Sequence, residues 1–222
     1  AESAAVDYNR PVAFFSLEMS ALQLTHRLMS MVAEIPGSKL RNAQMEDYEW
    51  QQLNSAVERF SEVPIFIDDT PAINIFELRA KCRRLKMHHD IQLVIVDYLQ
   101  LMSAGPEGKR GGTREQEIST ISRALKTMAK ELEVPVIALS QLSRAVETRG
   151  GNKRPQLSDL RDSGAIEQDA DIVTFIYRPD YYEMESDPTI SKDAAEILIS
   201  KHRNGALGTV GLKFIAQYAK FT

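Results

Sequence analysis

Three polar residues with chemically active side chains follow short apolar runs in this sequence. Glu18 follows PVAFFSL, Asp97 follows LVIV, and Gln141 follows VPVIALS. An acid that polarises water, an acid that holds a metal ion and a neutral amide that senses a phosphate make a set suited to phosphoryl transfer. The sequence therefore predicts a phosphate-handling site if the fold brings these three positions together.

Each of the three residues also has a structural interpretation. Asp97 can cap the loop or helix that follows it, and Glu18 can cap the helix that begins near Ser20. Gln141 can simply hydrogen-bond within its own loop. Taken one at a time, the residues do not separate the two interpretations, but their coincidence at successive strand ends favours function.

Apolar patterning predicts the elements that would position these residues. Runs rich in apolar residues predict strands at 11–17, 65–67, 93–97, 134–140 and 172–177. Amphipathic stretches between them predict helices at 20–35, 45–60, 75–88 and 114–132. This alternation indicates a single α/β domain over residues 1–222, with a mostly parallel, twisted sheet flanked by helices. Glu18, Asp97 and Gln141 would then meet at one edge of the sheet, where such folds bind ligands.

The end of the chain carries two cations on an expected β-hairpin. Strands predicted at 194–200 and 209–214 flank Asn204-Gly205, a dipeptide typical of hairpin turns. Lys201 and Arg203 lie on either side of His202 near this turn. A cation on such a tip can reach a nucleotide held by a neighbouring subunit. The alternative is a solvated basic turn.

A second group of residues suits single-stranded nucleic acid. Arg161, Asp162 and Gly164 lie in a polar segment, expected to be a loop, that follows Arg144 and Arg154. Cations attract the phosphate backbone, and a glycine allows it to approach closely. The alternative is an ordinary solvated charged surface.

Composition narrows the class of protein. The chain has 222 residues, of which 43% are hydrophobic and 26% charged, enough for one globular domain with a large core. A net charge of −4 means that any contact with nucleic acid must come from a local basic cluster. Cys82 is the only cysteine, which excludes an intrachain disulfide and fits a reducing cytosol. The sequence shows no membrane-spanning run and no signal-peptide pattern, so we expect a cytoplasmic location and no membrane partner.

One element expected of a nucleotide-hydrolysing domain does not occur in the sequence. No G-x-x-x-x-G-K-[ST] motif is present, although such a phosphate-binding loop should precede the first helix. The opening residues AESAAVDYNR suggest the end of a helix that begins upstream. We therefore expect an amino-terminally truncated domain that is inactive by itself.

Several motifs, in order along nearly the whole chain, resemble the C-terminal motor domain of DnaB-type bacterial replicative helicases. They are FFSLEMS, FIDDTP, LRAKCRRLK, VIVDYLQL, EVPVIALSQLSR, DLRDSGAIEQDADIV, YRPDYY and KHRNG. The resemblance implies a RecA-like fold, a homohexameric ring, ATP hydrolysis with Mg²⁺ at subunit interfaces, and translocation on single-stranded DNA at the replication fork. It also implies primase and a helicase loader as partners.

The same resemblance assigns roles to individual residues. Glu18 resembles the glutamate that activates water, Asp97 the Walker B aspartate that holds Mg²⁺ through water, and Gln141 the γ-phosphate sensor. Lys201 and Arg203 resemble cations that complete a neighbour's site. The loop residues Arg161, Asp162 and Gly164, with Arg144 and Arg154 before them, are expected at the DNA. A RecA- or RadA-like recombinase ATPase and a non-catalytic binding fragment are the alternatives.

Overall fold

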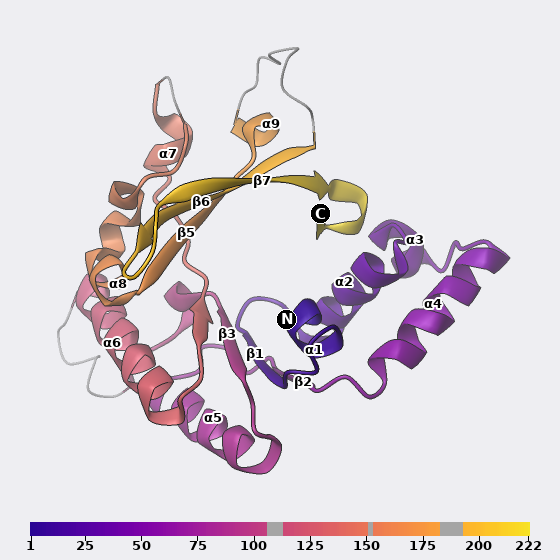
Figure 1. The fold of residues 1–222 in the computed structure, drawn as a ribbon, viewed down its shortest axis with the longest axis horizontal. Coiled ribbons are helices and arrows are strands. Elements are labelled where there is room, and N and C mark those ends of the chain that lie inside the picture. The colour runs from indigo at the N-terminus through magenta and orange to yellow at the C-terminus, as the bar shows by residue number, and fades with distance from the viewer. Residues whose placement is uncertain (106–112, 151–152, 183–192) are drawn as a thin grey trace. The chain divides into compact units, whose positions relative to one another are not determined.

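The computed structural model describes residues 1–105, 113–150, 153–182 and 193–222, and at residues 161–163 and 182 it describes the backbone alone (Figure 1). The chain divides into two compact units, Ala1–Gln141 and Leu142–Thr222. Each unit is built around its own sheet of four strands. None of the helices in the described ranges is both long enough and apolar enough to cross a membrane.

The first unit contains a parallel sheet whose strand order is β2-β1-β3-β4. The two central strands are buried along most of their length, which explains why their sequences are continuous apolar runs rather than alternating ones. The register places Ser16 opposite Asp97 and Val96 opposite Ala138. The carboxyl ends of β1, β3 and β4, which are neighbours, therefore lie at one edge. The four strands of the sheet are β1 (Val12–Ser16), β2 (Ile65–Asp68), β3 (Leu93–Asp97) and β4 (Val136–Ala138).

Helices of the first unit begin where the sequence supplies capping residues. Ser20 with Gln23, and Thr113 with Gln116, form capping boxes, and Asn74 caps a third helix. The helices are α1 (Glu2–Val6), α2 (Ala21–Ala33), α3 (Gly37–Asn42), α4 (Asp47–Phe60), α5 (Ile75–His89) and α6 (Arg114–Leu132), with a short 3-10 helix, η1, at Leu99–Leu101.

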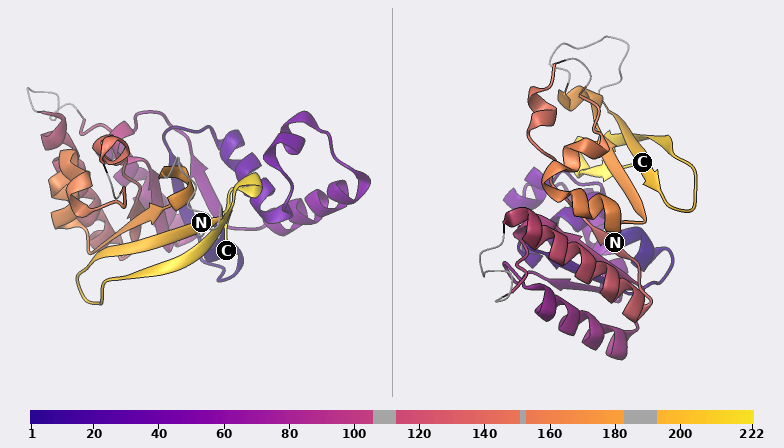
Figure 2. Two further views of the ribbon diagram at one scale, coloured as in Figure 1. Left: turned by 90° about the horizontal axis from the view of Figure 1, so that it is seen from above. Right: turned by 90° about the vertical axis from the view of Figure 1, so that its left-hand side faces the viewer.

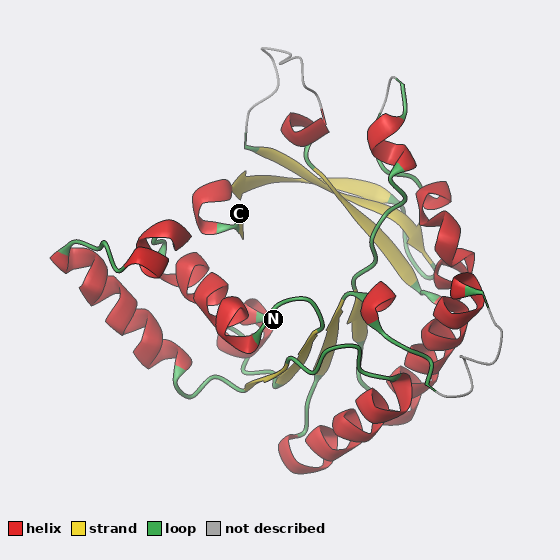
Figure 3. Cartoon of the chain, turned by 180° about the vertical axis from the view of Figure 1, so that it is seen from behind, coloured by secondary structure: helices red, strands yellow, loops and turns green. Residues whose placement is uncertain are grey.

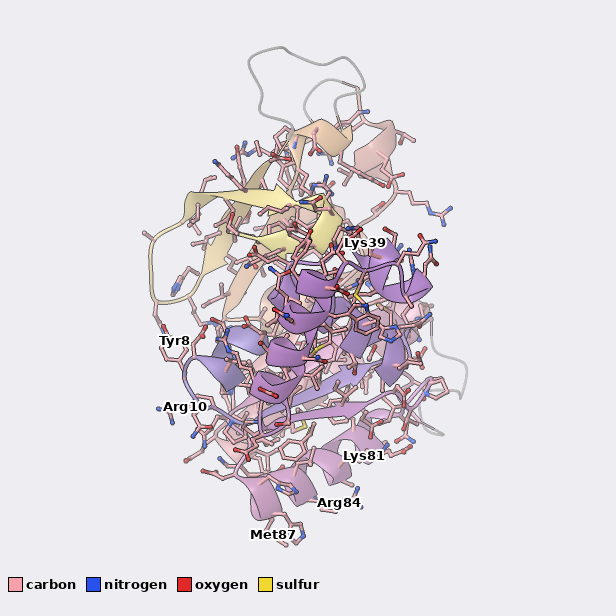
Figure 4. All side chains as sticks on the ribbon, turned by 90° about the vertical axis from the view of Figure 1, so that its right-hand side faces the viewer. Tyr8, Arg10, Lys39, Lys81, Arg84 and Met87 are labelled. Carbon is pink, nitrogen blue, oxygen red and sulfur yellow. The ribbon has the colours of Figure 1, made fainter. Side chains whose placement is uncertain are left out.

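Helices α5 and α6 lie next to each other (Figure 1). Leu78 and Cys82 are fully buried on α5, as Ile121 and Met128 are on α6. Glu131 at the end of α6 accepts hydrogen bonds from two arginines of α5. By contrast, Arg84 and Met87 lie on the outer surface of α5 (Figure 4). The basic residues of this helix thus lie outside an ordinary apolar stripe, where several pair with acidic side chains and others are exposed.

The second unit is an antiparallel sheet of order β5-β6-β7-β8 (Figures 2 and 3). Burial alternates along β5, as in a sheet with one packed face. Its strands are β5 (Ile172–Tyr177), β6 (Ala194–His202), β7 (Gly208–Ile215) and β8 (Lys220–Phe221). Its helical segments are α7 (Ala145–Thr148), η2 (Leu157–Ser163), α8 (Gly164–Asp169), α9 (Pro179–Tyr182) and η3 (Ala216–Tyr218).

The expected fold class, a parallel sheet flanked by helices with a carboxyl-terminal hairpin, is confirmed. Three local expectations are wrong. Residues 161–163 belong to the 3-10 helix η2 instead of a loop. The helix expected at 20–35 ends earlier, at Ala33, because Glu34 adopts a left-handed conformation, and Gly37 begins a separate helix, α3. Finally, β5 pairs with β6 in the antiparallel sheet and does not extend the parallel one.

The β6–β7 hairpin forms at the predicted place, but Gly205 is needed there for an unexpected reason. Neither Asn204 nor Gly205 has a positive φ, so the turn is not the mirror-image type that Asn-Gly usually marks. A Cβ atom on Gly205 would lie 2.8 Å from the ring of His202. Gly205 therefore leaves room for the imidazole to fold over the turn.

Candidate functional site

Asp97 ends β3 at the carboxyl edge of the parallel sheet. Its side chain is partly buried, and its main-chain oxygen accepts a hydrogen bond of 2.8 Å from the N–H of Leu17. The peptide bond that follows Asp97 is cis. The bond to Leu17 joins the end of β3 to the turn after β1, so the residue next to Leu17, Glu18, lies beside the Asp97 position.

Glu18 is exposed in a turn that is held at several points. The hydroxyl of Ser16, itself only 1% exposed, donates to the main-chain oxygen of Met19 at 2.7 Å. At the start of α2, the N–H of Ala21 donates to Asp69 Oδ2 at 2.8 Å. The turn is thus anchored both to β1 and to the end of β2, and Glu18 projects from a fixed backbone.

The two acids of this edge influence each other. Burial raises the pKa of Asp97 above its ordinary value, the negative charge of Glu18 raises it further, and Arg27 partly opposes both. Two carboxylates that repel each other make a site at which a cation is favoured. Carboxylate oxygen is also the ligand type that Mg²⁺ prefers.

The carboxylates fit a magnesium ion that is held mainly by other groups. Among the described residues no set of three or more histidine, cysteine, aspartate or glutamate side chains could enclose a metal. Mg²⁺ usually keeps several waters and binds through one or two carboxylates together with substrate phosphates. Asp97, with Glu18 nearby, can supply the one or two carboxylates that such a site takes from the protein.

Gln141 lies just beyond β4, the strand next to β3. It is exposed, and its main-chain N–H donates to Gln100 Oε1 at 3.2 Å. The structure therefore places Asp97 at the carboxyl end of β3, and Glu18 and Gln141 just beyond the carboxyl ends of the adjacent strands β1 and β4. The expected meeting of the three strand ends at one edge is confirmed. Their catalytic roles remain predictions.

Sequence reasoning missed two neighbours of this edge. Asp69 anchors the Glu18 turn, and its signal was the Asp68-Asp69 pair directly after a strand. Asp68 itself bonds Lys81 at 2.7 Å, and although burial opposes ionisation, the bonds from Lys81 and Thr70 lower the pKa of Asp68. Gln100 contacts Gln141, and its only signal was a polar residue inside the apolar stretch LQL.

In the second unit, the two predicted trans-acting cations bind the same helix end. Lys201 Nζ donates to the main-chain oxygens of Glu167 and, at 3.3 Å, Gln168. Arg203 donates to the same Gln168 oxygen at 3.2 Å and pairs with Asp171 at 3.1 Å. Cations are favoured at the carboxyl end of a helix, where carbonyl groups lack partners. Lys201 and Arg203 therefore cap the carboxyl end of α8.

The residues predicted to contact DNA have varied surroundings. Arg154 pairs with Glu196 and lies 5.4 Å from the centre of the Tyr177 ring. Arg144 is exposed immediately before α7, and Gly164 is the exposed first residue of α8. The side chains of Arg161 and Asp162 lie outside those that the structure describes.

The fold and the acidic edge define a RecA-like α/β protein. A KaiC-like protein, PH0186 from Pyrococcus horikoshii, shares the fold with a TM-score of 0.56 at 16% identity, over 99% of this chain and 78% of its own. Residues 1–222 match the family model described as the DnaB-like helicase C terminal domain. The chain therefore belongs to the family of DnaB-like helicase C-terminal domains.

Similar proteins support this membership. The chain is 50% identical over 221 residues to "Replicative DNA helicase DnaB" of Geobacillus stearothermophilus and 48% identical to "Replicative DNA helicase DnaC" of Bacillus subtilis. In each case the match covers 100% of the chain and 47% of the relative. The chain thus spans about half the length of the curated relatives it matches.

Two solved structures are also similar. One is described as a DnaB-like replicative helicase and its interactions with primase, and the other as an ATPase domain. Both have a TM-score of 0.89 and 42% identity over 97% of this chain. The matches cover 51% of the first chain and 75% of the second.

Proposed function

We propose that residues 1–222 form a single RecA-like motor domain of an ATP-hydrolysing replicative DNA helicase. One observation carries the proposal: in a chain of the DnaB-like helicase family, Glu18, Asp97 and Gln141 lie at or just beyond the carboxyl ends of three adjacent parallel strands. We place the motor in a homohexameric ring that moves on single-stranded DNA in the cytoplasm. Primase and a helicase loader are the proposed protein partners, and the description of a similar structure with primase supports the first of these.

Glu18 is proposed to activate the attacking water. Its carboxylate is exposed at the edge of the sheet, where it can accept a hydrogen bond from a water molecule and orient it towards a phosphorus atom. The bonds of the turn between Ser16 and Ala21 hold the backbone that carries Glu18, which limits the positions that its carboxylate can reach. This restriction matters because such catalysis depends on placement to within about 1 Å.

Asp97 is proposed to hold Mg²⁺ through water. A bound Mg²⁺ neutralises charge on the phosphates of ATP. The partial burial of Asp97 and the nearby Glu18 make its negative charge unfavourable without a cation. Asp97 would hold the metal through its water ligands, while Glu18, in the turn after the neighbouring strand β1, would remain available to the attacking water.

Gln141 is proposed to detect the terminal phosphate. A neutral carboxamide can donate a hydrogen bond to a phosphate oxygen without itself changing charge. Gln141 is also the last residue of the first unit, next to the segment that begins the second. A change in its hydrogen bonding on hydrolysis would act directly on the chain that leads to the proposed DNA-binding residues.

Lys201 and Arg203 are proposed to reach the nucleotide of a neighbouring subunit. In the structure both bind main-chain oxygens at the end of α8. A phosphate is a charged acceptor and forms stronger hydrogen bonds with these cations than a carbonyl does. The exchange of one acceptor for the other would link the neighbour's nucleotide to α8, which directly follows residues 161–163.

Arg144, Arg154, Arg161, Asp162 and Gly164 are proposed to lie at single-stranded DNA. In the full-length protein, Arg161→Ala should weaken binding of a single-stranded oligonucleotide and reduce the salt dependence of binding by roughly one charge. Fluorescence anisotropy at several salt concentrations measures this slope. An unchanged slope would return Arg161 to the interpretation of a solvated charged surface.

The activity itself is tested with the full-length protein on a forked DNA substrate. The proposal predicts single-strand-stimulated ATP hydrolysis and strand separation at the fork. Strand exchange without unwinding would instead identify a RecA- or RadA-like recombinase. Binding without any ATP hydrolysis would identify a non-catalytic binding module.

A further inference from the structure

Gln100 occupies the point at which the strands β3 and β4 separate. Before this point the two main chains are hydrogen-bonded to each other. The N–H of Leu139 donates to the oxygen of Val96, and the N–H of Leu99 donates to the oxygen of Leu139, both at 2.9 Å. Among the described residues these are the last main-chain bonds between the two strand ends. Beyond them, the side chain of Gln100 spans the gap.

The carboxamide of Gln100 uses both its donor and its acceptor. Its Oε1 accepts from the N–H of Gln141 at 3.2 Å, and its Nε2 donates to Ser140 Oγ at 2.9 Å and to the Gln141 oxygen at 3.3 Å. A carboxamide presents the same pair of groups as a peptide unit. The side chain therefore binds both main-chain groups of Gln141 as a neighbouring strand would, and it also holds the Ser140 hydroxyl.

Gln100 is the fixed partner in this contact. It lies in the 3-10 helix η1, between Leu99 and Met102, which are 1% and 2% exposed. Its main-chain oxygen accepts from Arg114 Nη2 at 2.6 Å, and the same nitrogen lies 3.2 Å from the oxygen of Met102. Gln141, by contrast, is exposed and lies outside any helix or strand.

We infer that Gln100 is a positioning residue for Gln141. By holding both main-chain groups of Gln141, it sets where the Gln141 side chain stands relative to Asp97, three residues before Gln100 in the same segment. This inference rests on the proposed function, in which Gln141 detects the terminal phosphate. Gln100 itself touches no reacting atom and acts only through its neighbour.

The test measures steady-state ATP hydrolysis by the full-length protein. Gln100→Met keeps the size of the side chain and removes both hydrogen-bonding groups, and it should lower kcat by about tenfold or more with KM within about twofold of wild type. Gln92→Met is the matched control, because among the described residues the carboxamide of Gln92 bonds only groups of Asp90, at 3.1 and 2.9 Å, beside the other end of β3. It should leave kcat and KM unchanged.

A double variant separates positioning from general stability. Combined with Gln141→Ala, Gln100→Met should cause no further loss of kcat, because its effect passes through Gln141. Gln100→Asn keeps the carboxamide but is too short to reach, so it should behave as Gln100→Met and replaces it if that variant does not fold. The inference would be overturned if the losses of kcat multiplied in the double variant, or if Gln100→Met and Gln100→Asn both left kcat unchanged.

The proposed function can fail separately from this inference. If the wild-type protein hydrolyses ATP and the effects of Gln100→Met and Gln141→Ala on kcat multiply in the double variant, only the role of Gln100 is wrong. If the wild-type protein does not hydrolyse ATP at all, the proposed function fails, and the role of Gln100 falls with it.

Discussion

At the scale of single residues, the edge of the sheet concentrates negative charge at Asp97. The folded chain favours the protonated form of this carboxyl because burial and Glu18 raise its pKa. Between its ordinary pKa near 4 and the raised value, the folded state binds more protons than the unfolded state, so this residue makes stability fall as the pH rises. Above the raised value the destabilisation is complete.

Asp97→Asn should therefore raise the melting temperature of the chain at pH 7 and change it little near pH 3.5. Thermal unfolding followed by circular dichroism across this range measures the effect. Asp90→Asn is a control of opposite sign, because a hydrogen bond from Lys86 lowers the pKa of Asp90 and its charge stabilises the fold above pH 4. A lower melting temperature for Asp97→Asn at pH 7 would contradict the electrostatic account of this site.

Some residues at this edge could be predicted from the sequence, and others could not. Glu18, Asp97 and Gln141 each follow an apolar run, and parallel strands place their carboxyl ends together, so their proximity was predictable. Asp69 and Gln100 were not predictable in the same way. Their importance lies in hydrogen bonds to the main chain of another segment, and such partners leave no periodic pattern in the sequence.

At the scale of elements, α5 is a helix with a basic sequence that nevertheless contributes buried side chains to the core. Leu78→Ala should reduce the free energy of unfolding by about 2–5 kcal/mol, because Leu78 is fully buried and its loss leaves a cavity. Met87→Ala, on the same helix, is the matched control, since Met87 is 81% exposed; it lies on the outer side of the helix (Figure 4). Urea titration measures the free energy of unfolding of both variants and of the wild type. Equal effects would mean that α5 does not pack as described.

The elements that the sequence predicted best are those with one strong period or one continuous apolar run. The helix α6 begins and ends as predicted, and β3 has the predicted bounds. The pairing of β5 was not predictable, because Ile172, Val173, Phe175 and Ile176 are apolar on both faces and conceal the alternation of burial.

At the scale of the whole molecule, the proposed motor needs residues from more than one subunit. Full-length Arg203→Ala and full-length Glu18→Gln should each lose ATP hydrolysis when assayed alone. In mixed rings, a site with an intact Glu18 can meet a neighbour with an intact Arg203, so part of the activity should return. The measurement is ATPase rate against mixing ratio, and a rate that stays at the level of the separate variants would contradict action in trans.

We propose that ATP is hydrolysed at the edge formed by Glu18, Asp97 and Gln141. The most direct test of this proposal is Glu18→Gln in the full-length protein, with Glu58→Gln, an exposed residue of α4, as control. Glu18→Gln should still bind ATP and turn it over at least about 10²-fold more slowly, because only the group that activates water is lost. The control should match wild type. Normal turnover by Glu18→Gln would contradict the account.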